Sequence, residues 1–138
     1  MADILEEFAN YLQAQGIATK GKDLLTNRMP AVEDPIFPNA KRCVVLFETP
    51  GRPTTKSSVI PDYNLQVYVR SDNQAWGRAK ARAIYDKLHG QKRFINTSAL
   101  TVTQCRGVGW PPIKFVDSSD GYWRFIVNYD CTVKGTSV

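Results

Sequence analysis

The sequence has few of the residues on which metal binding and disulfide frameworks depend. Its 138 residues include one histidine, His89, and three cysteines, Cys43, Cys105 and Cys131. A zinc site needs cysteine and histidine ligands at short, characteristic spacings, and these four residues are scattered. An odd number of cysteines without a secretory signal also argues against a disulfide framework. We therefore expect no metal or other cofactor, and three reduced thiols buried within strands.

The chain also lacks a long apolar run. A membrane-spanning helix needs roughly 20 consecutive apolar residues, and no segment approaches that length. The N-terminal string MADILEEFANYL is acidic and amphipathic, whereas a signal peptide begins basic and then becomes uniformly apolar. The pattern predicts a protein that is made in the cytoplasm and has no membrane partner.

Three strings look like functional motifs, but a structural explanation fits each of them better. His89 is expected at a helix C-terminus, where it would cap carbonyl groups and complement the helix dipole. The GVGWPP string at Gly107 has the GxG spacing, but Pro111 and Pro112 prevent the helix that a dinucleotide site requires. The DSSDG string at Asp117 lacks the distal glutamate of a calcium loop and is typical of a hairpin turn. With the carboxylates scattered as well, we predict that the chain is not an enzyme.

Charge is distributed unevenly along the chain. Residues 1–34 carry three positive and six negative groups, a net −3, and residues 35–138 carry fifteen and seven, a net +8, which together give +5. The segment 78–93 alone holds six basic residues and one acidic residue. This concentration predicts a basic surface. Its expected members are Arg78, Lys80, Arg82 and Lys87.

The basic surface has two interpretations. It can be an ordinary solvated helix face, or it can contact nucleic acid phosphates or an acidic partner. Sequence-specific readout would need more than clustered cations, and the chain has no helix-turn-helix, zinc-finger or RNP pattern. The cluster therefore supports at most a non-specific contact with DNA.

Hydrophobic periodicity predicts two amphipathic helices. The first covers residues 2–15 and stops at Gly16, a favourable C′ residue. The second begins after a cap at Ser71 or Asp72, runs to about residue 89 and stops at Gly90. Its expected apolar stripe consists of Ala75, Trp76, Ala79, Ala83, Ile84 and Leu88.

Apolar runs and two-residue alternation predict the strands. The predicted strands cover residues 42–48, 63–70, 100–106, 113–116 and 122–134, with a further short strand near 23–28. In the last strand the apolar residues alternate strictly from Trp123, and Ile126 is the one exception on the polar side. The order is α-β-β-β-α-β-β-β, which indicates one α+β domain over residues 1–138. We expect a single mostly antiparallel or mixed sheet, with two helices packed on one face and the other face polar and open to water or a partner.

A long exposed loop is expected over residues 49–61, where the string TPGRPTTKSSVIP contains three prolines. This loop is the leading candidate for a subunit interface or for a surface that lines a lumen. Its candidate contact residues are Arg52, Thr54, Thr55 and Lys56. The alternative is that the segment is simply a disordered surface loop.

Several segments together resemble a known family. They are LEEFANYLQAQGIAT, GKDLLTNRMP, VVLFETPGRPTT, YNLQVYVRSDNQAWGRAKARAIYDKLHG and PPIKFVDSSDGYWRFIVNYDCTV. In this order and spacing, they resemble the minor capsid and tail-terminator proteins of long-tailed bacteriophages. The resemblance covers nearly the whole chain, and the block at 63–90 is its most specific part.

The resemblance implies a structural protein of the virion without catalytic residues. It implies a homo-hexameric ring at the head-proximal end of the tail that ends polymerisation of the tail tube, contacts the tube protein and joins the tail to the head connector. DNA would pass through the lumen of the ring, and the protein would be made in the host cytoplasm. A ring needs heterologous contacts, and standard contacts bury about 800 Å² per partner. The alternatives are another neck or head-completion protein of the virion, and a non-virion nucleic-acid-binding module.

Overall fold

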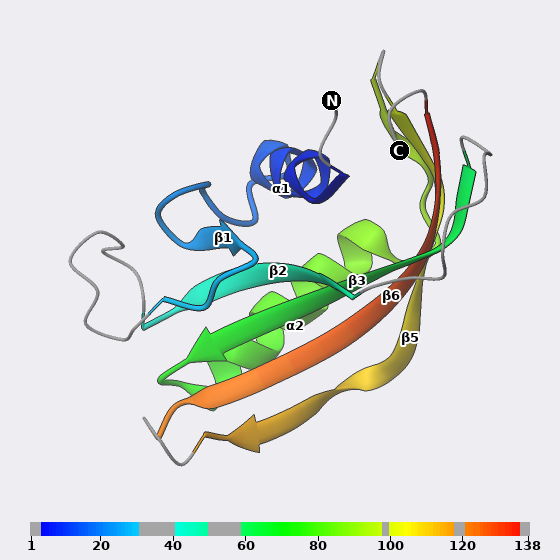
Figure 1. Cartoon of the computed structure of the whole chain (residues 1–138). Coiled ribbons are helices and arrows are strands. Elements are labelled where there is room, and N and C mark those ends of the chain that lie inside the picture. Colours follow the sequence, from blue (N-terminus) through cyan, green and yellow to red (C-terminus); the bar gives the residue numbers. More distant parts are fainter. Residues whose placement is uncertain (1–3, 31–40, 50–58, 98–99, 118–120, 136–138) are drawn as a thin grey trace.

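A computed structural model of the chain describes residues 4–30, 41–49, 59–97, 100–117 and 121–135. The element order is α1 (Ile4–Ala14), β1 (Leu24–Thr26), β2 (Cys43–Thr49), β3 (Val59–Ser71), α2 (Gln74–Leu88), β4 (Lys92–Asn96), β5 (Leu100–Val116) and β6 (Trp123–Gly135). The described strands form one six-stranded sheet in the order β1-β2-β3-β6-β5-β4. Only β1 and β2 pair in parallel; the other neighbours are antiparallel. Figure 1 shows a strongly curled sheet with α2 behind β3 and β6, which confirms the predicted α+β fold class.

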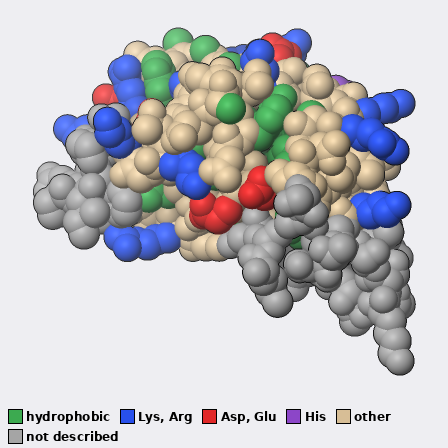
Figure 2. Space-filling model, turned by 90° about the horizontal axis from the view of Figure 1, so that it is seen from above, with side chains coloured by type: hydrophobic (Ala, Val, Ile, Leu, Met, Phe, Trp, Pro, Cys, Tyr) green, Lys and Arg blue, Asp and Glu red, His purple; other side chains and the backbone are tan. Residues whose placement is uncertain are grey.

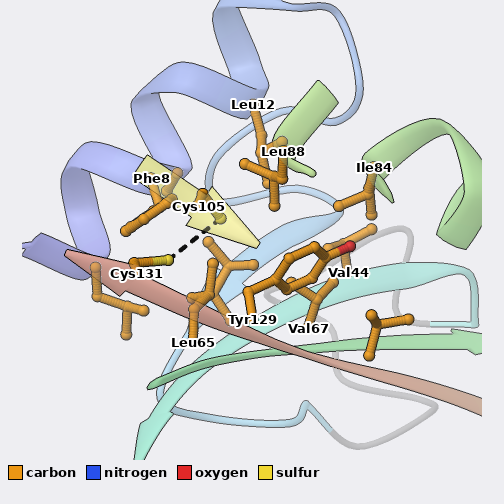
Figure 3. Close-up of a cluster of buried hydrophobic side chains, with 14 of the residues drawn as sticks. Phe8, Leu12, Val44, Leu65, Val67, Ile84, Leu88, Cys105, Tyr129 and Cys131 are labelled. Carbon is orange, nitrogen blue, oxygen red and sulfur yellow. Dashed lines mark hydrogen bonds between the residues drawn. The ribbon is translucent and has the colours of Figure 1, made fainter. Parts of the chain in front are cut away.

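Both helices pack on the same face of the sheet. Phe8 and Leu12 of α1 and Ile84 of α2 belong to one buried cluster with the inward side chains of β3 and β6. Figure 3 shows these side chains meeting between the helices and the strands. The apolar alternation predicted for the last strand is confirmed from Phe125 onward, because Phe125, Val127, Tyr129, Cys131 and Val133 are buried; Arg124, on the predicted polar side, is buried as well.

The three cysteines are buried and reduced, as predicted. The thiols of Cys105 and Cys131 lie on neighbouring strands, with Sγ of Cys131 donating to Sγ of Cys105 at 3.2 Å (Figure 3). The hydrogen bond and burial raise the pKa of Cys131 far above its usual range. Burial raises the pKa of Cys43 as well. The thiols of Cys43 and Cys131 therefore stay protonated and behave as small apolar groups.

Helix α1 ends as the sequence indicates. Gly16 has a φ of +75°, a conformation that glycine adopts without a steric penalty. Its amide donates to the carbonyl of Gln13, and the amide of Ile17 donates to the carbonyl of Leu12. This pair of hydrogen bonds is a Schellman motif, which satisfies carbonyls at the helix end.

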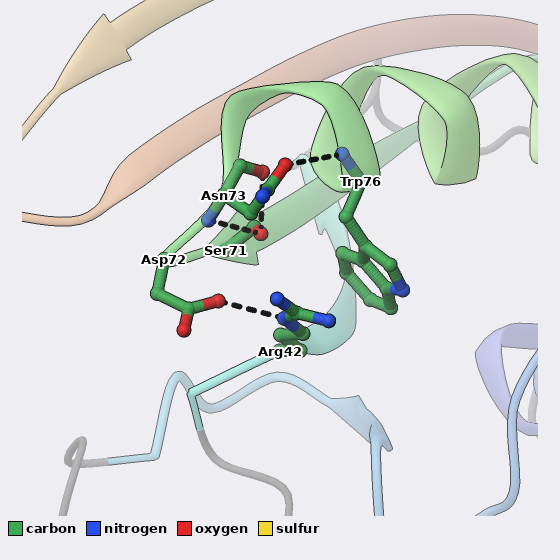
Figure 4. A network of polar contacts seen from close by, with 5 residues as sticks. All are labelled: Arg42, Ser71, Asp72, Asn73 and Trp76. Atoms are coloured by element: carbon green, nitrogen blue, oxygen red, sulfur yellow. Dashed lines mark hydrogen bonds and ion pairs between the residues drawn. The ribbon is translucent and has the colours of Figure 1, made fainter.

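Helix α2 is capped by Asn73, so the prediction of Ser71 or Asp72 is wrong. The Asn73 side chain accepts from the amide of Trp76 at 3.0 Å. Ser71 still belongs to β3, where it pairs with Trp123 of β6, and its hydroxyl contacts the backbone of Asn73. The Asp72 carboxylate instead accepts from Nε of Arg42 at 2.7 Å (Figure 4). The helix begins later than predicted because sheet pairing extends through Ser71.

The buried face of α2 also differs from the predicted stripe. The buried residues are Gly77, Ala81, Ile84 and Leu88, whereas Ala75 and Ala79 are exposed. A Cβ on Gly77 would lie only 2.4 Å from Cε2 of Phe125. Gly77 therefore allows α2 to pack closely on the sheet. Because the Gly77 side of the helix faces the sheet, Ala75 and Ala79 face water.

The second half of the sheet contains the largest error in the predicted strands. Strand β4 was not predicted, and the two predicted strands 100–106 and 113–116 are parts of one strand, β5. Between Val108 and Ile113 the register with β6 shifts, and within this irregularity Gly109 has a φ of +86° and the Trp110–Pro111 peptide is cis. In the described part of the chain, β4 pairs only with residues 101–104 of β5. Prolines are tolerated beyond residue 104 because the outer edge of β5 makes no backbone hydrogen bonds there to any neighbouring strand that the structure describes.

The predicted loop 49–61 is also bounded differently. Thr49 belongs to β2, and Val59 to Pro61 belong to β3. The register between β3 and β6 shifts between Ile60 and Tyr63, so the proline lies at a bulge, where a missing amide is tolerated. Residues 50–58 lie outside the described residues.

Candidate assembly surfaces

The sheet face without helices is not uniformly polar, so that expectation is wrong at one end. Leu25, Cys43 and Val45 form a second buried apolar cluster there, against which Met29 and Phe47 pack. The chain before residue 31 runs close to this end, since the guanidinium of the buried Arg70 donates to the carbonyl of Pro30. Part of the face is therefore covered by the chain itself.

Farther along this face Arg124 of β6 is also buried, but the apolar residues of β5 are exposed. Directly paired residues point to the same side of a sheet, and one such row runs Val45, Tyr68, Ile126, Ile113 across four strands. The row starts in the buried cluster and ends in water, because Ile113 is 59% exposed. The apolar surface thus continues outward from the small cluster onto the open strand.

Two more residues of β5 share this exposed side. Phe115 is 42% exposed and pairs with Arg124, and Val108 is 52% exposed and pairs with Asn128. We call Val108, Ile113 and Phe115 the β5 patch. Sequence reasoning missed it, although Ile126 was noted as the one apolar residue on the polar side of its strand. That exception is the signal that could have revealed the patch.

The opposite end of the uncovered face is polar, as predicted. There Asn64 of β3, Asp130 of β6 and Arg106 of β5 lie in one row. Arg106 and Asp130 form an exposed ion pair with a 3.7 Å separation. Exposed pairs of this kind contribute little to stability, so this end is an ordinary hydrated surface.

The predicted basic residues of α2 do not act as one group. Nζ of Lys80 donates to the carbonyl of Ile17 at 2.7 Å and lies 5.2 Å from the centre of the Trp76 ring. It therefore ties α2 to the chain that follows α1. Lys87 is exposed, and its carbonyl accepts from the Tyr11 hydroxyl at 2.9 Å.

Arg78 and Arg82 do lie together, next to the indole of Trp110. Their guanidinium carbons are 5.8 and 5.3 Å from the ring centre. Arg82 also forms an ion pair with Asp86 at 3.1 Å, one helical turn away. In the view of Figure 2, Lys and Arg side chains are dispersed around the outline and do not gather in one patch. Of the predicted basic residues, Arg78 and Arg82 are therefore held together beside a tryptophan, and the role of the basic surface stays a prediction.

His89 is the C-cap of α2, as predicted, and its backbone amide donates to the carbonyl of Tyr85 at 2.8 Å. Its Nδ1 accepts from the amide of Gly107 at 2.9 Å, and its ring stacks on Tyr85 with the centroids 4.7 Å apart. A Cβ on Gly107 would lie 2.5 Å from Cε2 of the same tyrosine. The GxG string therefore serves close packing of β5 against α2.

Three further expectations concern the loop after β2, metal binding and membrane-spanning helices. The loop residues Arg52, Thr54, Thr55 and Lys56 lie outside the described residues, so their predicted interface role stays a prediction. Within the described ranges, no three His, Cys, Asp or Glu side chains are grouped so that they could hold a metal ion. Neither described helix has the length and apolarity needed to cross a membrane.

A family model described as "Bacteriophage tail terminator protein" matches residues 11–134, which include the last turn of α1, all of α2 and nearly the whole sheet. The chain belongs to the bacteriophage tail terminator family. Members of this family are structural components of the virion tail and not enzymes, which confirms the prediction of a non-catalytic protein.

Solved structures show that the fold of this tail terminator protein recurs in virions. A chain of the "Virion of native gene transfer agent (GTA) particle" matches with a TM-score of 0.67. The match covers 96% of this chain and 95% of the other, at 17% sequence identity, and therefore shows the shared fold. No curated protein matches the sequence significantly.

Proposed function

We propose that this tail terminator protein forms a homo-hexameric ring that caps the tail tube. The ring would sit at the head-proximal end of the tail, end polymerisation of the tube protein and join the tail to the head connector. The observation that carries this proposal is the family match over residues 11–134, which includes α2 and nearly the whole sheet. The shared fold with a chain of another virion adds support.

The surfaces of the molecule suit such a role. A ring subunit must present two different surfaces, one to each neighbour. The helices cover one face of the sheet, while the other face carries an exposed apolar patch and a polar end. This asymmetry provides unlike surfaces on opposite sides of one rigid sheet.

The arginine pair on α2 is the candidate for contact with DNA in the lumen. Phosphate contacts need clustered cations and no base-reading geometry. Arg78 and Arg82 are exposed and held beside Trp110, so they present two guanidinium groups at a defined place. Lys80 is less available for this role, because its half-buried ammonium already donates to the carbonyl of Ile17.

Tube capping is the direct test. The purified protein is added to polymerising tube protein of the same virion, and tube lengths and tube ends are examined by negative-stain electron microscopy. We expect shorter tubes with a ring at one end, and a mass of six chains for the ring released from them. Tubes that grow to the same length with and without the protein would refute the proposal.

A further inference from the structure

We infer that the β5 patch, Val108, Ile113 and Phe115, is a surface through which one copy of this chain contacts the next copy. The inference rests on the ring of the proposed function and assigns one side of its subunit interface. In the described part of the chain, the exposed large hydrophobic residues Val108, Ile113, Phe115 and Val116 all lie on β5. The first three share the face that no helix covers.

The patch is part of a continuous apolar surface. Ile113 lies next to the half-buried Ile126, which lies next to Tyr68. Tyr68 in turn packs against the small buried cluster, with its ring edge-on to Phe47 at a centroid distance of 5.0 Å. This apolar surface is covered at one end and exposed at the other. An exposed, contiguous apolar surface often marks a site of contact with another molecule.

The contact is expected to be made by side chains on the sheet face and not by pairing of strand edges. Beyond residue 104, the outer edge of β5 has no strand partner in the described part of the chain. Pro111 and Pro112 lack amide donors, and the register shift from Val108 to Ile113 distorts the strand. Such features block edge-to-edge addition of a strand. The exposed face remains as the route for association.

Charge favours a second copy of this chain as the occupant. The protein carries a net charge of +5, so two copies repel each other unless they meet at a surface that is locally neutral. The residues around the patch are uncharged, such as Asn128, or paired within the chain: Arg124 lies 3.5 Å from Asp117. A DNA backbone would instead require exposed cations at the contact.

The size of the patch explains why it needs a ring. From the exposed fractions, its three side chains present on the order of 300 Å² of apolar surface. A stable standard interface buries about 800 Å² per partner, so two patches packed against each other would make a weak dimer. In a heterologous contact, the patch packs against a different and larger surface of the neighbouring copy. Ring closure repeats this contact at every subunit boundary.

Thiol protection tests the assignment with a mild substitution. Ile113→Cys places a thiol in the patch, and Val116→Cys is the matched control, because Val116 is 47% exposed on the same strand but on the helix-covered side. The native cysteines are buried and give little background. Labelling by a maleimide is measured for the free chain and for the assembled ring, on or off tail tubes.

We expect the thiol at position 113 to be labelled at least about tenfold more slowly in the ring than in the free chain, since interface cores exclude water. The thiol at 116 should retain its rate. Equal labelling at position 113 in both states would overturn the inference while leaving the proposed ring intact. A wild-type chain that never assembles, even on tubes, would refute the proposed function instead, and the inference with it.

A charged substitution gives a second, independent measurement. Ile113→Asp should weaken ring formation by at least about tenfold in association constant, because the charge loses water in the contact. Val116→Asp should leave assembly near wild type. Circular dichroism and denaturant unfolding first establish that both variants are folded. Wild-type assembly of a folded Ile113→Asp variant would contradict the assignment.

Discussion

The two faces of the sheet are built from the same strands, yet only one is fully covered. On β6, Phe125 is completely buried beneath α2, while its neighbour Ile126 on the other face is only partly buried. The first face is covered by both helices. On the second, the described buried residues are the cluster around Val45 and two arginines, Arg70 and Arg124. Strand alternation therefore decides which residues share a face, but the elements packed on each face decide whether it meets water.

The largest expected effect is a difference in the free energy of unfolding between substitutions at two adjacent residues of β6. Phe125→Ala should lower the free energy of unfolding by about 3–5 kcal/mol, because it leaves a cavity beneath α2. Ile126→Ala on the other face should lower it by about 1 kcal/mol or less, since this side chain is already partly hydrated. Denaturant unfolding of the isolated chain measures both. Equal losses would show that the two faces are equally covered in the free protein.

The contact between α2 and the sheet gives the next effect. Alanine is normally favoured over glycine inside a helix by about 1 kcal/mol. Gly77→Ala should nevertheless destabilise the protein by about 1–3 kcal/mol, because its Cβ would collide with Phe125. The control is Ala79→Gly on the exposed side, which should show only the ordinary propensity loss. A more stable Gly77→Ala variant in thermal or denaturant unfolding would show that the helix has room to move away.

The cap of α2 is expected to have a smaller effect. Asn73→Ala should cost about 1 kcal/mol, because the amide of Trp76 loses its acceptor. Asp72→Ala removes only an exposed contact to Arg42 and should cost clearly less. Unfolding experiments on the two variants decide which residue caps the helix. A larger loss at position 72 would favour the cap that the sequence indicates.

The smallest expected effect on stability concerns Glu6, which attaches α1 to the edge of the sheet. Hydrogen bonding by Lys20, 2.9 Å away, and also by Thr26 lowers the pKa of Glu6. A lowered pKa in the folded state contributes stability above the unfolded-state pKa, and this contribution is lost as the pH falls through the folded-state pKa. Because the pair is partly exposed, Glu6→Gln should cost only a few tenths of a kcal/mol at pH 7. The difference from wild type should shrink as the pH falls through the folded-state pKa of Glu6; a difference independent of pH would contradict this role.

Local signals in the sequence were sufficient for much of the fold. The alternation from Phe125, the helix stop at Gly16 and the α-β-β-β-α order of the first five elements all appear in the structure. They are decided by neighbouring residues along the chain, which is where periodicity and capping act. The candidate site was predicted less well, because Lys80 is engaged with Ile17, 63 residues away.

The sequence by itself determined the composition of each face, the reduced state of the cysteines and the absence of catalytic motifs, since these follow from residue types and their spacing. Only the tertiary structure decided that β5 runs through Pro111 and Pro112, because a proline is tolerated where an edge has no partner. It alone decided that Gly77 and not the alanines faces the core, because Phe125 leaves no space for a side chain. The exposed β5 patch likewise depends on where the helices pack, and packing joins residues that no local pattern connects.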